Sequence, residues 1–445
     1  MSKSRQTTRR QFLQGMAAAG TAGLMLSSGT RAFGYQSPND RPVFATIGLR
    51  NQGWAITSKT FKFADFAALV DVDSKVLAAN VARTEGAQSK KPDAYKDYRK
   101  VLEREDIDAV MIATPDHWHT KIAVEAMHAG KDVYCEKPLA LTIRQGRCMV
   151  EAVRKHERVF QTGAQFRSCP GVRRACELVR NGRLGEIRRV RTWVAPNSFT
   201  GPGPGWKPMP VPDGFDYNLW LGPTPEAPYH VERCFHRWRY ILDYSNGQTT
   251  NFGAHTNDIA QWGLGTDGTT PVEFEDTGAA FPPRGSLFTA ATKTSFRARY
   301  ANGVELICET RQPSATKFEG TEGRLEVNLG GSMKSFPENL KDSVIGPDEI
   351  HLPRSNPARE ENVRKHIDAD HVRNFLDAVK SRQDPIEPVE VGFSTASLCL
   401  LANMAQILKR KFAWDPVTQR SPDDEVNGML SRAMRDPWGP ELLES

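Results

Sequence analysis

The sequence has few cysteines and few aromatic residues for its 445 residues: seven Cys in all, and aromatic side chains at 9%. Seven is an odd number, and no two cysteines show the Cys-x-x-Cys spacing, so the sequence predicts neither a disulfide framework nor a metal site. The remaining composition, 39% hydrophobic and 25% charged, is that of a globular protein. It excludes a disordered chain and a collagen-like rod, and the length suffices for two domains.

Excess charge and long apolar runs are also missing from most of the chain. The formal charge is +6, but residues 1–34 contain five basic groups and no acid, so the remainder carries about +1. No basic surface for nucleic acid or for an anionic membrane is therefore expected. We find no apolar run near the roughly 20 residues of a membrane-spanning helix, the best candidate being residues 15–26. The mature chain is expected to have no membrane partner.

Residues 1–34 have the pattern of a leader. Arg9 and Arg10 are followed by Phe12 and Leu13, then by a short, weakly apolar stretch and small residues. This order resembles a twin-arginine export signal, which directs folded proteins across a bacterial inner membrane. The alternative is a basic amphipathic first helix. The resemblance predicts a periplasmic protein that folds before export.

Strands and helices alternate in the first third of the chain. Short apolar runs at 43–49, 66–72, 107–113 and 133–135 predict strands, and residues 121–129 have helical spacing. Thr142 and Gln145 form a capping box that opens a helix to about residue 156. Such alternation is typical of βαβ units. We therefore expect a doubly wound parallel sheet in a domain of residues 42–165.

The pattern changes after about residue 185. Residues 187–194 and 289–310 alternate as strands, and Asn302 with Gly303 predicts a tight hairpin. Two apolar helices are expected near the end, around residues 372–379 and 398–408. Residues 201–228 contain five Gly and eight Pro, too many for a regular element, and they are either a sugar-facing lid or a plain surface loop. The fold prediction for residues 166–445 is an α+β domain with a mostly antiparallel open sheet.

The first predicted strand ends in a nucleotide-binding pattern. Gly48 and Gly53 occupy the outer positions of a dinucleotide fingerprint, with Arg50, Asn51 and Gln52 between them. Arg50 replaces the middle glycine, so its guanidinium either contacts the phosphates or obstructs binding. Asp71 ends the next strand.

A carboxylate at the position of Asp71 accepts hydrogen bonds from the adenosine ribose and repels a 2′-phosphate. This favours NAD as cofactor, with NADP as the alternative because Lys75 and Arg83 lie nearby in the sequence. A turn of purely structural importance is the other interpretation of the loop.

Two further segments follow strands of the predicted parallel sheet. Thr114–His119 follows one strand and Glu136–Pro138 the next, so both lie at the edge where such sheets bind ligands. If burial lowers its pKa, Lys137 can exchange a proton with a substrate hydroxyl; otherwise it is a surface lysine paired with Glu136. His255 and Asp258 would share one face of a helix, which suits an imidazole oriented by a carboxylate, although a buried structural histidine is the alternative.

Together these segments resemble the Gfo/Idh/MocA family of sugar and polyol oxidoreductases, over residues 43–414. The segments are the nucleotide loop, Thr114–His119, Glu136–Pro138, Gly163–Ser168 and Gly253–Asp258. The leader makes the chain similar to exported members such as glucose-fructose oxidoreductase. The resemblance implies a Rossmann domain, a second domain whose open sheet often mediates oligomers, and a dimeric or tetrameric assembly.

The resemblance also implies roles for individual residues. Lys137 would lie beside the nicotinamide and His255 would be an acid/base, while Thr114, Pro115 and His119 would line the cofactor. Gln165 and Arg167 would approach the site from the domain junction, and Arg239 would face the substrate. The family usually has aspartate where this chain has Asn251, so an amide or Asp258 would have to hold the imidazole of His255.

Three functions are therefore considered. The first is hydride transfer between a carbohydrate hydroxyl and a tightly held nicotinamide cofactor, with Lys137 and His255 moving the proton. The second is NAD-dependent glycoside hydrolysis through transient C3 oxidation and elimination. The third, motivated by Arg50 and Asn251, is sugar binding without catalysis on a decayed Rossmann scaffold.

Overall fold

The computed structural model describes residues 41–197, 201–357 and 367–439. Residues 41–445 form one compact unit. The predicted leader at residues 1–34 lies outside the described residues.

A six-stranded, wholly parallel sheet forms the core of the first half. Its strand order is β3-β2-β1-β4-β5-β6, the doubly wound order of a Rossmann fold. The strands are β1 (Val43–Ile47), β2 (Asp65–Val70), β3 (Asp93–Tyr95), β4 (Ala109–Ile112), β5 (Asp132–Glu136) and β6 (Phe160–Gly163). The order reverses between β1 and β4, and this switch point is where such sheets bind ligands.

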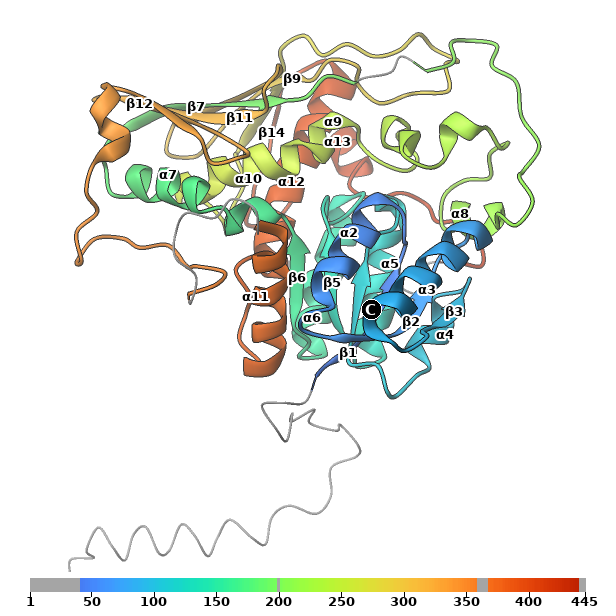
Figure 1. The fold of residues 1–445 in the computed structure, drawn as a ribbon. Coiled ribbons are helices and arrows are strands. Elements are labelled where there is room, and N and C mark those ends of the chain that lie inside the picture. Colours follow the sequence, from blue (N-terminus) through green and yellow to red (C-terminus); the bar gives the residue numbers. More distant parts are fainter. Residues whose placement is uncertain (1–40, 198–200, 358–366, 440–445) are drawn as a thin grey trace, which may run out of the picture. The chain divides into compact units, whose positions relative to one another are not determined.

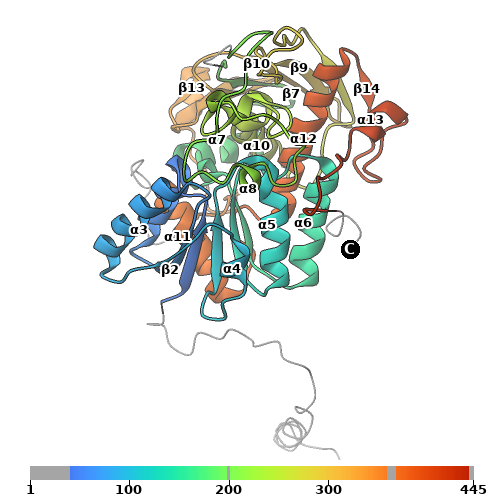
Figure 2. The same ribbon diagram turned by 90° about the vertical axis from the view of Figure 1, so that its right-hand side faces the viewer.

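Helices flank this sheet, as Figures 1 and 2 show. They are α2 (Asn51–Thr60), α3 (Ser74–Gln88), α4 (Arg99–Leu102), α5 (Asp116–His128) and α6 (Ile143–Lys155). Half of the expected capping box is present, because the Thr142 hydroxyl accepts a hydrogen bond of 3.2 Å from the backbone N–H of Gln145. The Gln145 side-chain oxygen accepts its bond of 3.2 Å from the Leu141 N–H instead of the Thr142 N–H. Two helices from the end of the chain also pack here, α11 (Ile367–Ser381) against α2 and α12 (Val389–Leu408) against α6.

An eight-stranded sheet dominates the second half, in the order β13-β12-β11-β7-β10-β9-β8-β14. Only the pairing of β7 with β10 is parallel, so the mostly antiparallel sheet predicted from the sequence is confirmed. Asn302 and Gly303 lie in the turn between β9 and β10, where Gly303 has φ +87°. The strands are β7 (Ile187–Val194), β8 (Glu273–Asp276), β9 (Ser295–Arg299), β10 (Glu305–Thr310), β11 (Ala315–Gly320), β12 (Arg324–Asn328), β13 (Met333–Phe336) and β14 (Phe412–Ala413).

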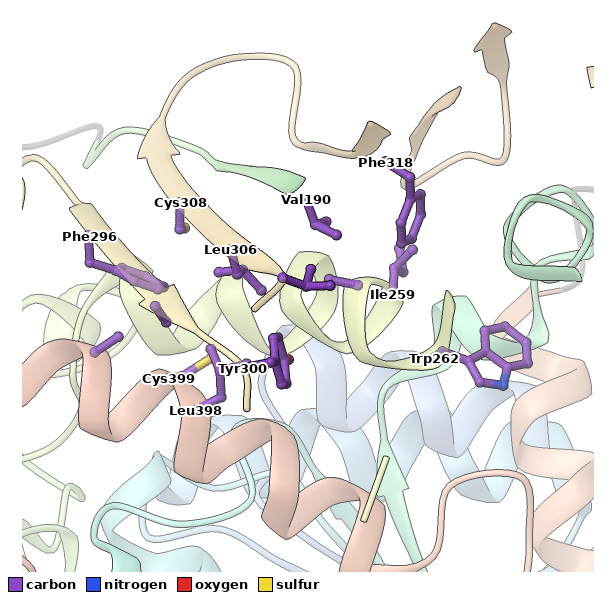
Figure 3. Packing of buried hydrophobic residues seen from close by; sticks show 14 of the residues in the cluster. Val190, Ile259, Trp262, Phe296, Tyr300, Leu306, Cys308, Phe318, Leu398 and Cys399 are labelled. Atoms are coloured by element: carbon purple, nitrogen blue, oxygen red, sulfur yellow. The ribbon is translucent and has the colours of Figure 1, made fainter. Parts of the chain in front are cut away.

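Helices cover one face of this sheet and form the larger core with it. Figure 3 shows side chains of the strands, such as Phe296 and Leu306, directed toward Ile259 and Leu398 on the helices below. The helices are α7 (Pro170–Arg180), α10 (Gly253–Leu264) and α12. The opposite face carries Arg–Glu pairs such as Arg297 with Glu275.

Helix α12 corrects one expectation from the sequence. Among the described residues it is the helix long and apolar enough to cross a membrane, whereas no run of that length was recognised in the sequence. Most of its side chains are buried between the second sheet and α6 and α10. It is therefore a core helix of this fold.

The Pro- and Gly-rich segment after residue 200 is more ordered than predicted. It contains the short helix α8 (Tyr217–Leu221), contrary to the expectation of no regular element. Asp216 caps this helix by accepting a hydrogen bond of 2.9 Å from the Leu219 N–H. Phe215 and Trp220 belong to an aromatic cluster that extends to residue 288.

Candidate active site

The turn from β1 into α2 is built around two glycines. Gly48 has φ +88°, and a Cβ there would lie 2.7 Å from the Ala113 carbonyl oxygen. At Gly53 a Cβ would lie only 1.8 Å from the Gly48 carbonyl oxygen. Both positions therefore require glycine, the first for the sharp turn and the second for close packing of the helix on the strand.

The first turn of α2 is open to an anion. Arg50 precedes the helix and provides no side-chain cap, and the first turn contains no acidic residue. Asn51, the first helical residue, has φ +34°, a conformation that asparagine tolerates better than most side chains. The uncapped N–H groups suit a phosphate.

A cavity of about 640 Å³ extends from this turn. Predicted cofactor residues line it: Gly48, Arg50, Asn51, Gln52, Asp71, Thr114 and Pro115. Asp71 is 8% exposed, and its carboxylate accepts hydrogen bonds of 3.0 Å from the Leu49 N–H and 2.9 Å from the Asp73 N–H. The Thr114 hydroxyl is buried and has no hydrogen-bond partner in the described structure. The glycine turn, the uncapped helix and the unpartnered hydroxyl fit a bound dinucleotide.

Arg50 lies at the wall of this cavity. Its Nη2 is 2.6 Å from a carboxylate oxygen of Asp73, and its guanidinium stacks 4.2 Å from the ring centroid of Phe235. Asp73 also caps α3 through its other oxygen. The arginine thus links the Rossmann sheet to the segment that contains α8, an arrangement that the sequence did not predict.

Lys137 lies at the carboxyl end of β5 and is held by Asn251, the last residue of α9 (Gln248–Asn251). Its Nζ donates to the Asn251 side-chain oxygen at 2.8 Å and to the Asn251 carbonyl oxygen at 3.0 Å. Burial, together with the charge of Arg239, lowers the pKa of Lys137 to about 8. The ammonium group is thus fixed in place and readily deprotonated.

Neighbouring groups form the rest of a buried polar cluster. Glu136 accepts a hydrogen bond of 3.0 Å from Gln52, and burial raises its pKa to about 7. Asp116 accepts one of 2.6 Å from the Ser245 hydroxyl, and burial raises its pKa as well. His119 is 1% exposed, and its ring nitrogens face the carbonyl oxygens of Pro138 at 2.8 Å and Thr114 at 3.0 Å. The imidazole therefore joins the segments that follow β4 and β5, and it is not among the residues that line the cavity.

His255 lies near Lys137, but neither predicted partner holds it. Burial lowers the pKa of His255 well below its usual value, and the charge of Lys137 adds to this effect. Its Nδ1 has no hydrogen-bond partner among the described residues. Its ring packs edge-on against Phe166 at 4.7 Å. The predicted Gln165 lies beside that phenylalanine, and its side-chain oxygen is likewise buried without a partner.

The expectation that Asp258 or Asn251 orients His255 is not met. Asp258 accepts hydrogen bonds from Nε and Nη2 of Arg167, the shortest 2.6 Å, and one of 3.2 Å from the Thr395 hydroxyl. The Asn251 oxygen is taken by Lys137 instead. A helical spacing of three residues places two side chains on one face, but it does not decide which partner each of them finds.

Arg167 is also placed differently from the expectation. It is 2% exposed and pairs with Asp258 and Asp267, with Glu387 3.7 Å away. It does not line the cavity. Arg167 therefore has a structural role at the junction below α10, not an evident contact with substrate.

Arg239 does line the cavity, together with His236 and Trp238. Its Nη1 donates to the His236 carbonyl oxygen at 3.0 Å, and its guanidinium lies 4.2 Å from the Trp238 ring centroid. His236 and Phe235 could not be predicted from the sequence, because neither stands in a recognisable motif. Asp116 lies within the predicted segment Thr114–His119, and its position at the start of a helix that follows a strand is a signal that could have identified it.

Comparison with known proteins identifies both halves of the chain. Residues 47–164 match the oxidoreductase family's NAD-binding Rossmann fold, and residues 198–440 match the oxidoreductase family's C-terminal alpha/beta domain. The solved structure of levoglucosan dehydrogenase with NADH shares the fold. It has a TM-score of 0.63 at 18% identity and covers 84% of this chain and 98% of that chain.

Two curated proteins show local similarity. Levoglucosan dehydrogenase of Pseudarthrobacter phenanthrenivorans is 37% identical over 128 residues, which are 27% of this chain and 32% of the relative. A glycosyl hydrolase family 109 protein of Shewanella pealeana is 28% identical over 200 residues, 40% of this chain and 44% of the relative. The chain thus spans less than half the length of these relatives. Its two matched domains nevertheless account for most of residues 41–445, and the chain belongs to the Gfo/Idh/MocA oxidoreductase family, with an NAD-binding Rossmann domain and the family's C-terminal domain.

Proposed function

We propose that the protein is an NAD-dependent oxidoreductase that acts on a hydroxyl group of a carbohydrate. The observation that carries this proposal is the position of Lys137. Its Nζ is held by two oxygens of Asn251, at the ligand-binding edge of the parallel sheet. A buried amine with a lowered pKa has no evident structural purpose there.

The cavity residues would hold the cofactor. Gly48 and the first turn of α2 would receive the diphosphate, and Asp71 would accept hydrogen bonds from the adenosine ribose. The Asp71 carboxylate favours NAD over NADP, since it would repel a 2′-phosphate. NAD, when bound, accepts or returns a hydride at the substrate carbon.

Lys137 would manage the hydroxyl proton. In its neutral form the amine accepts that proton as the alcohol is oxidised, and the Asn251 oxygens fix the direction of its lone pair. His255 is neutral at ordinary pH because burial lowers its pKa, so its open Nδ1 could relay the proton. We propose no role for Asp258 in proton transfer, since its oxygens accept hydrogen bonds from Arg167 and Thr395.

We also propose that the protein is exported through the twin-arginine route to the periplasm. The support is the leader sequence around Arg9 and Arg10. Outside the cytoplasm no free nicotinamide pool is expected, so the cofactor would be loaded before export and restored in place. Turnover then needs either a second substrate that takes the hydride back or a reaction without net oxidation. Replacing both arginines by lysine and fractionating the cells tests this route.

NAD-dependent glycoside hydrolysis is the second candidate. The similarity to a glycosyl hydrolase family 109 protein favours it, as does the need for a closed redox cycle. The third hypothesis, a non-catalytic scaffold, was motivated by Arg50 and Asn251, and the contacts of these two residues argue against it. Arg50 is held at the cavity wall, and Asn251 has a defined partner in Lys137.

A panel of free sugars and aryl glycosides decides between the first two. Release of free aglycone without accumulation of NADH supports hydrolysis. A stable ketosugar or lactone formed together with NADH supports net oxidation. No product from any sugar or glycoside, with the cofactor present, would count against both. Light scattering of the same preparation tests the further proposal of a homodimer or homotetramer.

A further inference from the structure

We propose that the substrate carries a carboxylate, and that Arg239 binds it in the cavity. This inference rests on the proposed oxidoreductase function and narrows its substrate class to sugar acids such as uronates. Uronates and sugar phosphates are both anionic sugars. Of their two anionic groups, the carboxylate fits the edge of the guanidinium formed by Nε and Nη2.

The guanidinium of Arg239 is held in a fixed plane without an acidic partner. It stacks on Trp238, and its Nη1 contacts the carbonyl oxygen of His236 at 3.0 Å and the Nδ1 of His236 at 3.3 Å. None of the ion pairs between described residues includes Arg239. Two nitrogens of this half-buried guanidinium, Nε and Nη2, therefore have no hydrogen-bond partner in the described protein.

The other cationic side chains of the cavity lining are either paired with a carboxylate or exposed to solvent. Arg50 is paired with Asp73. Lys75, Arg83 and Lys96 are exposed to solvent, where water satisfies their charge. Within the described lining, Arg239 is thus the cation that is both half-buried and without a carboxylate.

The free donors lie on one edge of the guanidinium. Nε and Nη2 form the parallel pair that binds the two oxygens of a carboxylate in a bidentate fashion. His236 adds a further donor, since its Nδ1 accepts from Arg239 and its proton therefore lies on Nε2. A planar carboxylate offers two charged oxygens that match the two parallel donors, whereas a hydroxyl offers a single neutral oxygen.

The surrounding charges favour an anion as well. Arg239 lines the cavity and interacts electrostatically with Lys137 and with the two acidic groups Asp116 and Glu136. Those acidic groups are engaged elsewhere, Asp116 by Ser245 and Glu136 by Gln52. Burial raises the pKa of both carboxyl groups. Burial thus favours the protonated, uncharged form of the two carboxyl groups beside the cations Lys137 and Arg239.

Isothermal titration of the NAD-loaded protein tests this assignment without requiring turnover. The probes are D-glucuronate and D-galacturonate, with D-glucuronamide as a neutral amide of the same size and D-glucose 6-phosphate as the other anion. We expect at least one uronate to bind roughly 10- to 100-fold more tightly than the amide, the range of a charge-assisted hydrogen-bond pair. In Arg239→Gln this ratio falls to about one, and Arg239→Lys retains part of it.

Arg311→Gln is the matched control, because Arg311 also stacks on an indole, that of Trp193 at 4.4 Å, but lies outside the cavity lining. It should keep the wild-type ratio. Equal binding of uronate and amide by the wild type, a preference that survives Arg239→Gln, or tighter binding of the sugar phosphate would overturn the proposal. The NAD content and the melting temperature of each variant are measured alongside. A protein that holds NAD and oxidises neutral sugars, but binds uronate no more tightly than the amide, refutes this inference and leaves the proposed function intact.

Discussion

The side-chain oxygen of Asn251 lies 2.8 Å from Nζ of Lys137, although 114 residues separate the two in the chain. An amide oxygen accepts a hydrogen bond without carrying charge, so it fixes the amine without stabilising its protonated form as a carboxylate would. Asn251 thus keeps Lys137 in place while allowing burial to lower the pKa of the amine.

Asn251→Asp should therefore shift the pH dependence of the reaction. A carboxylate next to Lys137 raises the pKa of the amine, by about 1–3 units for an opposite charge at this distance. The neutral, proton-accepting form then appears only at higher pH. We expect the rising limb of the pH profile of kcat/KM to move upward accordingly, measured with any accepted sugar. Asn251→Ser, which adds no charge, should slow the reaction without this upward shift; the same shift in both variants would contradict the account.

Lys137→Met should abolish oxidation while the cofactor stays bound. Loss of a general base costs roughly 10²- to 10⁴-fold in rate. In the wild type, kcat/KM should rise with pH through about 8, because the protonated amine cannot accept the hydroxyl proton. Stopped-flow measurement of NADH formation, together with NAD content by mass spectrometry, checks both statements. A variant that remains active with a flat pH profile would assign proton transfer to another group.

Arg50→Met should release the cofactor faster. The Arg50 guanidinium bridges Asp73 and Phe235 at the cavity wall, and opening that bridge is expected to precede dissociation. The pair is partly exposed, so the two contacts together contribute about 1 kcal/mol, or roughly fivefold in dissociation rate. Retention of NAD after rapid dilution measures this rate.

Arg41→Met is the control for that experiment, because Arg41 is as exposed as Arg50 and pairs with Asp65 outside the cavity. Slower release from Arg50→Met than from the wild type would show that Arg50 obstructs the cofactor.

Arg167→Ala should lower the free energy of unfolding rather than weaken substrate binding. Its removal leaves the carboxylate of Asp258, which is 1% exposed, without its main partner, at a cost of about 3–5 kcal/mol. Arg154→Ala, which breaks the exposed pairs with Asp384 and Glu390, should cost less than about 1 kcal/mol. Urea denaturation compares the two. A raised KM with unchanged stability in Arg167→Ala would restore the substrate role expected from the sequence.

Local patterns predicted the fold well, since each depends on neighbours in the sequence. Gly48 and Gly53 marked the nucleotide turn because no other residue fits there. Thr142 marked a helix start and Gly303 a hairpin. Only the second half of helix α12 was predicted, at residues 398–408. Its first turns, from Val389, were not, because its buried faces leave little periodic contrast between apolar and polar positions.

The site was predicted less completely, because its partners come from distant segments. Lys137 and Asn251 were both identified, but their contact was not. Phe235, which packs on Arg50, stands in no motif at all. The same reason explains the error at Asp258, where helical spacing suggested His255 and the folded chain supplied Arg167 from 91 residues away. Pairing across the domain junction depends on the packing of α10 against η1 (Gln165–Ser168), which no local pattern encodes.

The central claim is that this protein carries a nicotinamide cofactor in the cavity that begins at Gly48. Mass spectrometry of the small molecules released from protein purified from the cytoplasm tests it most directly. We predict NAD or NADH in near-equimolar amount, with little NADP. A protein that is empty on isolation, and that shows no binding when titrated with NAD and NADH, would contradict the account.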